Sequence, residues 1–319
     1  MTLSNSRVLV IGGGGFLGSH LVDQLTQEPV REIVVLDNFA RGARTNLCQA
    51  LQDERVRIVE GSITDLELLR DLMQDTDYVF HLAALWLYEC EHQPRAALEV
   101  NVVGTYNVIE TAQQAGVKKV VYSSSASVYG DAIFTPMTED HPFNNRTFYG
   151  ATKVAGEQMC RAFHHRYGLD YVGLRYMNVY GPRQDARGVY TSVIMKVLDR
   201  IDRGLAPIVY GDGSQTYDFV YVEDVARANV LAAKSDATDR FYNVGCGIGT
   251  SVRELVELLL KLTGSSLEIQ YEPAGETFVT QRIGSPERAK RDLGFEATTD
   301  LTDGLLRLIA WRRGQKQEG

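Results

Sequence analysis

The sequence has few cysteines, few prolines and no long apolar run, and each absence excludes a class of protein. Its 319 residues include 4 cysteines that are scattered and form no CxxC pair, so neither a zinc site nor a disulfide framework is indicated. Only 8 prolines accompany 44% hydrophobic residues, which argues against long disordered stretches. No apolar run approaches the length of a membrane span, and no leader-like segment opens the chain. We expect a cytoplasmic protein without a membrane partner.

Positive charge is also scarce. The chain has 33 lysines and arginines against 41 aspartates and glutamates, a net charge of −8. This balance offers no general attraction to nucleic acid, so no nucleic-acid partner is expected. The length is sufficient for one large domain or two closely joined domains with a substantial core.

A glycine-rich segment directly follows the first predicted strand, residues 7–11. Gly12, Gly15 and Gly18 permit a tight turn, close approach of backbone N–H groups to a pyrophosphate, and close packing of the following helix. A second apolar strand ends in Asp37, about 20 residues after the last glycine, where dinucleotide-binding units carry an acidic residue. Such a side chain accepts hydrogen bonds from the adenosine ribose and repels a 2′-phosphate. The sequence therefore predicts NAD as the cofactor.

Apolar strands alternate with helical patterns over most of the chain. This alternation predicts an α/β fold, a doubly wound parallel sheet of Rossmann type with helices on both faces. We expect residues 171–175 to form the last strand of the nucleotide-binding half. The NAD-binding domain is predicted to cover residues 1–180 together with residues 217–245. Residues 181–216 and 246–319 are predicted to form a smaller, partly interleaved α/β substrate-binding lobe.

Two short stretches in the middle of the chain carry the candidate chemistry. Tyr149 and Lys153 are four residues apart, so on a helix their side chains share a face. An ammonium group beside a phenol lowers the pKa of the phenol and gives a usable base near neutral pH. Upstream, the serine run at residues 123–127 offers a hydroxyl for the same substrate oxygen. With a hydride acceptor bound, this set predicts reversible oxidation of a sugar.

These motifs, in this order, resemble those of the extended short-chain dehydrogenase/reductase family, particularly its nucleotide-sugar epimerases and dehydratases. The resemblance also rests on His-Leu-Ala-Ala at 81–84, on Arg-Tyr-Met-Asn-Val-Tyr-Gly-Pro-Arg at 175–183, and on Gly-Asp-Gly-Ser-Gln-Thr at 211–216. It extends over nearly the whole chain. It implies the same fold, NAD as a tightly held cofactor, no metal, a nucleotide-sugar substrate and a homodimer.

The resemblance implies roles for individual residues. Tyr149 would be the acid/base, Lys153 would lower its pKa and hold the nicotinamide ribose, and Ser125 would be the third catalytic residue. Ser123 and Ser124 are expected to pack or to touch the cofactor. The residues implied to contact NAD are Gly12, Gly15, Phe16, Leu17, Gly18, Asp37, Asn38, Ser62, Ile63, Leu82, Ala83, Ala84, Tyr149, Lys153 and Tyr176. Those implied to contact the substrate are Ser125, Ser127, Asn178, Tyr217 and Arg282.

Residues that depart from the family pattern narrow the reaction. The 4,6-dehydratases typically carry Asp and Glu where this chain has Ala126 and Ser127, and decarboxylating members usually carry a glutamate at the second position. The resemblance therefore favours an epimerase of a nucleotide-diphosphate sugar, with a UDP-sugar inverted at C4. A nucleotide-sugar oxidoreductase or dehydratase that releases a keto-sugar is the alternative, and a catalytically silent NAD-binding protein is a third hypothesis. Trp86 is unusual in the family and either narrows the sugar pocket or belongs to the core.

Two phosphate-binding arginines of the family are missing. Tyr217 stands where an arginine usually precedes Asp-Phe, and Ala274 and Gly275 follow Pro273 where a second arginine is usual. Arg282 is the nearest replacement, and Arg183 or Arg187 could also contribute.

Overall fold

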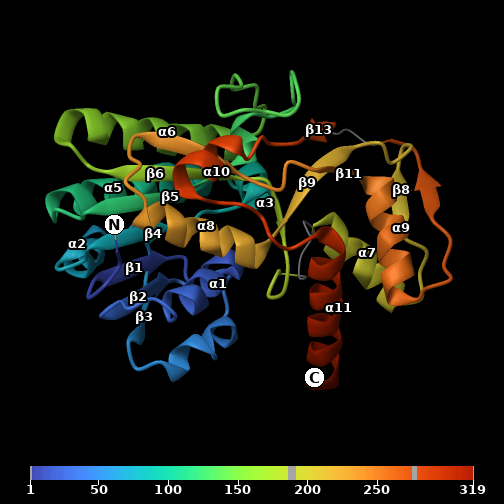
Figure 1. The fold of residues 1–319 in the computed structure, drawn as a ribbon, viewed down its shortest axis with the longest axis horizontal. Helices are drawn as coiled ribbons and strands as arrows, with labels where there is room; N and C mark the ends of the chain where they lie inside the picture. Colours follow the sequence, from blue (N-terminus) through green and yellow to red (C-terminus); the bar gives the residue numbers. More distant parts are fainter. Residues whose placement is uncertain (1, 186–191, 275–278, 319) are drawn as a thin grey trace.

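The computed structural model describes residues 2–185, 192–274 and 279–318, and a seven-stranded parallel sheet forms its larger part (Figure 1). The strand order is β10-β6-β5-β4-β1-β2-β3. In chain order the strands are β1 (Arg7–Ile11), β2 (Glu32–Asp37), β3 (Val56–Glu60), β4 (Tyr78–His81), β5 (Lys119–Ser125), β6 (Tyr171–Tyr176) and β10 (Arg240–Val244). Most are apolar and β-branched, as strands buried on both faces are. The predicted doubly wound α/β fold is confirmed.

β10 is the strand that local sequence pattern did not assign. It comes from much later in the chain than β6, yet the two pair in parallel with Arg240 opposite Val172. β6 is therefore not the last strand of the sheet, and the expectation for residues 171–175 was wrong in that respect. The reason is a long-range one, because the chain leaves the sheet, builds other elements and then returns to its edge.

Helices cover both faces of the sheet (Figure 1). On one face, α1 (Phe16–Leu25) and α8 (Val222–Lys234) bury Leu21 and Val225 in the same apolar cluster as Val10. On the other face lie α2 (Leu66–Met73), α5 (Thr105–Gln114) and α6 (Phe148–Tyr167). Ile109 of α5 packs in a second apolar cluster with Leu9 of β1. Consecutive residues of β1 thus belong to opposite layers, as the pleat of a strand requires.

The second lobe is built on small sheets beside the large one. β9 (Thr216–Tyr221) pairs with β7 (Asn178–Tyr180), β11 (Gly249–Ser251) and β13 (Gln281–Arg282), while β8 (Ile208–Tyr210) pairs with β12 (Gln270–Glu272). Three helices enclose its core, α7 (Val193–Asp202), α9 (Val252–Thr263) and α11 (Leu301–Glu318). Met195, Leu255 and Leu305 from these helices share one buried cluster.

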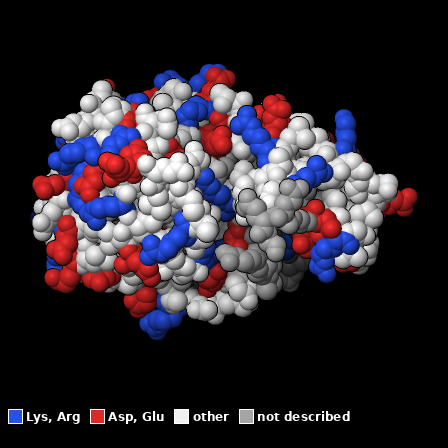
Figure 2. Space-filling view, turned by 90° about the horizontal axis from the view of Figure 1, so that it is seen from below, with Lys and Arg blue, Asp and Glu red and all other residues white. Residues whose placement is uncertain are grey.

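The remaining helical elements are short. They are η1 (Arg44–Leu47), η2 (Ala50–Gln52), α3 (Leu87–His92), α4 (Pro94–Ala97), the π-helical η3 (Leu98–Gly104), η4 (Ala126–Val128) and α10 (Glu287–Leu293). Across the described ranges, no helix has both the length and the apolar character needed to cross a membrane. On the face seen in Figure 2, basic and acidic residues are interspersed.

Candidate active site

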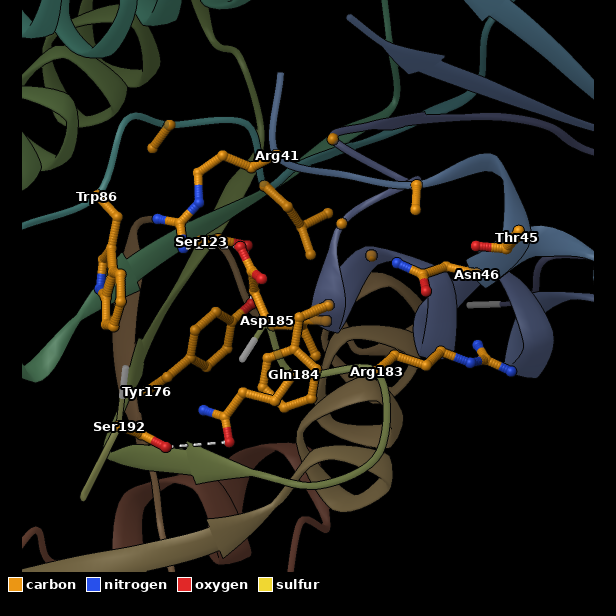
Figure 3. Close-up of a pocket in the computed structure, with 18 of the residues that line it drawn as sticks. Arg41, Thr45, Asn46, Trp86, Ser123, Tyr176, Arg183, Gln184, Asp185 and Ser192 are labelled. Atoms are coloured by element: carbon orange, nitrogen blue, oxygen red, sulfur yellow. Dashed lines mark hydrogen bonds and ion pairs between the residues drawn. The ribbon is translucent and has the colours of Figure 1, made fainter. Parts of the chain in front are cut away.

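A cavity of about 670 Å³ lies at the carboxyl edge of the parallel strands (Figure 3), where doubly wound sheets bind their ligands. Its walls come from the turn after β1, the ends of β4, β5 and β6, helices α6 and α11, and the loop after β7. Ten residues predicted to contact the cofactor line it, namely Gly12, Gly15, Phe16, Leu17, Gly18, Leu82, Ala84, Tyr149, Lys153 and Tyr176. Five others do not, namely Asp37, Asn38, Ser62, Ile63 and Ala83.

The glycine turn has no room for side chains. Gly12 has a φ of +84°, and a Cβ added there would lie 2.7 Å from the backbone nitrogen of Ala83. A Cβ on Gly18 would overlap the carbonyl oxygen of Gly12. α1 begins at Phe16, directly after Gly15, and no side chain caps its N-terminus. The first N–H groups of the helix are therefore available to a ligand. This cradle fits the pyrophosphate of a dinucleotide.

Asp37 supports this cradle. Its carboxylate accepts hydrogen bonds from the backbone N–H groups of Gly14 and Phe39, both at 2.8 Å. Burial raises the pKa of Asp37, and these backbone hydrogen bonds oppose the rise. Because a carboxylate has about four acceptor positions, its oxygens can still accept a ribose hydroxyl.

Three of the residues predicted to contact NAD have other surroundings. Ile63 is buried in the apolar cluster beneath the sheet. The Ser62 hydroxyl bonds the Thr64 hydroxyl at 2.8 Å, and the Asn38 side chain accepts from the N–H of Ala40. Their contact with a cofactor stays a prediction.

Tyr149 and Lys153 line the cavity, and Ser125 lies next to Tyr149. α6 begins at Phe148. Thr147 caps its N-terminus, because the Thr147 hydroxyl accepts a hydrogen bond from the N–H of Gly150 at 3.1 Å. The Lys153 ammonium lies 5.7 Å from the centre of the Tyr149 ring. The Ser125 hydroxyl, at the end of β5, donates to the Ser127 hydroxyl at 3.1 Å and lies close enough to the Tyr149 phenol to lower its pKa. The predicted catalytic set is therefore assembled in space.

The pKa values of this set reflect burial. Burial lowers the pKa of Lys153 to about 8. It also raises the pKa of Tyr149, while the Ser125 hydroxyl and the charge of Arg282 act in the opposite direction. Lys153 is not among the groups that lower the pKa of Tyr149, and desolvation of the phenol outweighs those that do.

The first two serines of the run are held by the protein itself. The Ser123 hydroxyl bonds the Tyr176 hydroxyl at 2.8 Å. The Ser124 hydroxyl donates to Glu157 at 2.6 Å, and Glu157 forms a buried ion pair with Arg175 at 2.7 Å. Both serines line the cavity. Their hydroxyls, however, hydrogen bond to other protein side chains. This agrees with the expectation that they pack or touch the cofactor.

Three residues predicted to contact the substrate lie in the small sheet around β9. Asn178 stands opposite Phe219, and Tyr217 stands opposite Arg282. Ser127 lies nearer the catalytic set, since its backbone N–H donates to the Ser125 hydroxyl at 3.1 Å. Neither these four residues nor Ser125, the fifth residue predicted to contact the substrate, belongs to the lining of the 670 Å³ cavity.

Of the candidate replacement arginines, Arg183 lines the cavity and pairs with Asp23 at 2.6 Å. Arg187 lies outside the described residues. Arg282 has a buried Nε for which the described residues provide no hydrogen-bond partner.

Arg41 was missed by sequence reasoning. Its guanidinium lies 5.1 Å from the centre of the Trp86 ring, 3.4 Å from Glu89 and 3.6 Å from Asp185 (Figure 3). These contacts join the loop after β2 to the segment after β4 and to the loop after β7. Trp86 lines the cavity, and its predicted effect on the width of the sugar pocket stays a prediction. Other lining residues without a local signal are Ala43, Thr45, Asn46, Gln184, Asp185, Ser192, Trp311, Arg312 and Gln315.

Comparison with known proteins agrees with this geometry. The model of the NAD dependent epimerase/dehydratase family matches residues 8–245. A UDP-glucose 4-epimerase of Mycolicibacterium smegmatis is 35% identical over 314 residues, which are 98% of this chain and 100% of the relative.

Solved structures give the same result. A UDP-N-acetylglucosamine 4-epimerase of Methanobrevibacter ruminantium, in complex with UDP-N-acetylmuramic acid, matches with a TM-score of 0.93 and 32% identity over 98% of this chain and 99% of that one. A UDP-glucose 4-epimerase of Thermotoga maritima, with UDP-glucose, matches with a TM-score of 0.91 and 34% identity over 97% and 99%. The chain thus belongs to the NAD-dependent epimerase/dehydratase family, with NAD as its cofactor.

Proposed function

We propose that the protein inverts C4 of a UDP-sugar. The observation that carries this proposal is the Tyr149 phenol, which lines the cavity beside Lys153 and lies close to the Ser125 hydroxyl. Ala126 and Ser127 support epimerisation over elimination of water, because neither supplies the carboxyl groups that elimination needs. The UDP-sugar 4-epimerases to which the chain is similar support the substrate class.

The cofactor would be held at both ends of the cavity. The glycine turn and the start of α1 would bind the pyrophosphate. Lys153 and Tyr176, which line the opposite wall, would hold the nicotinamide half. When bound, NAD accepts a hydride from C4 and returns it, and its positive nicotinamide favours the phenolate of Tyr149.

Tyr149 is the proton acceptor in this mechanism. As phenolate it takes the proton of the C4 hydroxyl, which yields a 4-keto sugar as the C4 hydride leaves. Ser125 donates to the same oxygen and stabilises the charge that develops on it. Rotation of the keto sugar in the cavity presents its other face. Hydride return and proton return from Tyr149 then give the inverted alcohol, with no net oxidation.

Residues 1–180 and 217–245 form the NAD-binding domain in this proposal, and residues 181–216 and 246–319 form the substrate-binding lobe. β7 and most of β9 fall in the first set of ranges but pair in the small sheet of the second lobe, so they connect the two parts. The pairing of β10 with β6 and the packing of α8 on α1 support the assignment of the second segment. We also assign the protein to the cytoplasm, since NAD and nucleotide sugars are metabolites of that compartment.

A homodimer through α5 and α6 is part of the proposal. Tyr106 and Tyr167 are 41% and 55% exposed, and both rings pack on Phe163 between them. Val103, 43% exposed, extends this apolar surface. Light scattering after size-exclusion chromatography is expected to give twice the chain mass, and Tyr106→Asp should halve it.

The test of the reaction is proton NMR of purified protein with UDP-glucose, UDP-N-acetylglucosamine or UDP-glucuronate, without added cofactor. A C4-epimer signal is expected, and Tyr149→Phe should abolish it. Turnover that requires added NAD and releases a keto-sugar would instead establish the oxidoreductase or dehydratase alternative.

A further inference from the structure

The loop after β2 and the segment after β4 flank the glycine turn. β1 lies between β2 and β4 in the sheet, and the glycine turn follows β1. Neighbouring strands are about 4.8 Å apart, so the two flanking connections start roughly 10 Å from one another. The Arg41 side chain crosses this distance from the loop after β2, and its guanidinium lies 5.1 Å from the centre of the Trp86 ring (Figure 3). A side-chain bridge thus passes the carboxyl end of β1, where the cradle for the pyrophosphate lies.

The backbone at each end of this bridge is fixed. In the loop after β2, the Asn46 amide donates to the carbonyl oxygen of Gly14 at 3.0 Å, which attaches the loop to the glycine turn itself. In the segment after β4, the N–H of Leu85 donates to the Asn101 side chain at 2.7 Å. The contact across the bridge is made by side chains, so rotation of the Arg41 side chain opens it while the backbone on both sides stays in place.

Arg41 also contacts two carboxylates. Its guanidinium lies 3.4 Å from Glu89, in the helix that follows Trp86, and 3.6 Å from Asp185, in the loop after β7. The Arg41, Glu89 and Asp185 side chains are 34%, 27% and 25% exposed, so salt screens these pairs less than it screens fully exposed ones. Arg41, Trp86 and Asp185 line the cavity together with the glycine turn. One side chain therefore joins three segments around the space that fits the dinucleotide.

We propose that Arg41 is a gate for the cofactor, and that NAD enters or leaves the cavity when the guanidinium releases Trp86 and the two carboxylates. Arg41 is thus a positioning residue that determines how long NAD stays bound. The inference needs only that NAD is the cofactor, so it holds whichever sugar is the substrate. In an epimerase the same NAD must return its hydride, and a closed gate keeps the reduced cofactor beside the keto sugar.

The test measures NAD exchange and NAD affinity separately. Exchange of bound NAD for labelled NAD in the holoenzyme gives the dissociation rate constant, and calorimetric titration of protein stripped of NAD gives Kd. Arg41→Ala should raise the dissociation rate constant by about 10-fold, because a cation–π contact and two partly exposed ion pairs are lost. Its Kd should stay within about 3-fold of wild type, because the lost contacts join protein groups and slow entry and exit alike. Added salt should accelerate exchange in the wild type and not in Arg41→Ala.

Arg44→Ala is the matched control. The Arg44 guanidinium lies 4.6 Å from the centre of the Phe39 ring and 2.6 Å from Glu60. These are the same kinds of contact that Arg41 makes, yet Arg44 is not part of the cavity lining in the described structure. NAD exchange in Arg44→Ala should equal that of wild type. Wild-type melting temperatures will establish that both variants are folded.

Three results would overturn the inference. Wild-type exchange in Arg41→Ala would exclude a gate. A higher dissociation rate constant with an equal rise in Kd would make Arg41 a direct ligand of the dinucleotide. Faster exchange in Arg44→Ala as well would indicate a general loosening of the loop after β2. None of these measurements needs turnover, so absence of epimerisation, which would refute the proposed function, leaves the test of the gate intact.

Discussion

The Lys153 ammonium lies 2.8 Å from the carbonyl oxygen of Ser123. This hydrogen bond fixes α6 to β5, and so holds the helix that carries Tyr149 against the strand that carries Ser125. The same lysine is 5% exposed, and burial disfavours its charged form. Lys153 thus positions the catalytic residues, and its burial lowers the free energy of unfolding.

Lys153→Met should raise the melting temperature at pH 7 and abolish epimerisation. Because the pKa of Lys153 falls from 10.5 to about 8 on folding, the unfolded chain holds more protons between these values, and stability rises with pH across that window. Below pH 8 the whole cost is present, up to about 3 kcal/mol at 1.4 kcal/mol per pH unit. Calorimetry at pH 7 and pH 10 measures the difference. A variant that melts below wild type at pH 7 would contradict this account.

Tyr149→Phe should lower kcat by about 10³-fold or more, and Ser125→Ala by about 10- to 100-fold. Since burial raises the pKa of Tyr149, kcat/KM should increase with pH through the neutral range. The Ser125 hydroxyl opposes that rise in pKa, so Ser125→Ala should shift the increase to higher pH. A full pH profile of both proteins measures this shift. If the two pH profiles superimpose, Ser125 does not affect the pKa of Tyr149.

Gly18→Ala should weaken NAD binding by about 100-fold and destabilise the fold by about 1–3 kcal/mol, because the added methyl group overlaps the Gly12 carbonyl. Gly314→Ala is the control, since no atom lies within 4 Å of a Cβ at that position. The control should be neutral or gain up to about 1 kcal/mol from helix propensity. Calorimetric titration with NAD and urea unfolding test both changes. Normal NAD affinity in Gly18→Ala would rule out the tight cradle.

Arg175→Met should destabilise the protein by about 3–5 kcal/mol, because it leaves the Glu157 carboxylate buried and unpaired. The side chains of this pair are 5% and 0% exposed. The double variant Arg175→Met with Glu157→Leu should recover part of the loss, since both charges are then gone. Urea unfolding of the wild type, the two single variants and the double variant gives the coupling free energy between Arg175 and Glu157. Additive losses in the double variant would show that the two charges act independently.

Sequence pattern predicted the features that depend on neighbours in the chain. The glycine turn, β1, β2, β6 and the helix of Tyr149 and Lys153 all have local signals, and each was predicted. Arg41 was missed because its partners Trp86 and Asp185 come from other segments. The spacing of residues in the sequence also does not indicate that the Asp37 carboxylate accepts a hydrogen bond from the N–H of Gly14. Burial of Tyr149, which determines the direction of its pKa shift, likewise depends on the whole fold.

The position of β10 beside β6 has a consequence for the order of folding. Arg240 and Val172 are neighbours in the sheet, although the chain between them forms β7, α7, β8, β9 and α8. Closing so long a loop costs chain entropy before any contact repays it, and non-local pairings of this kind slow folding. The edge of the sheet is therefore expected to be its last part to form. Destabilising α7, residues 193–202, would delay that final step.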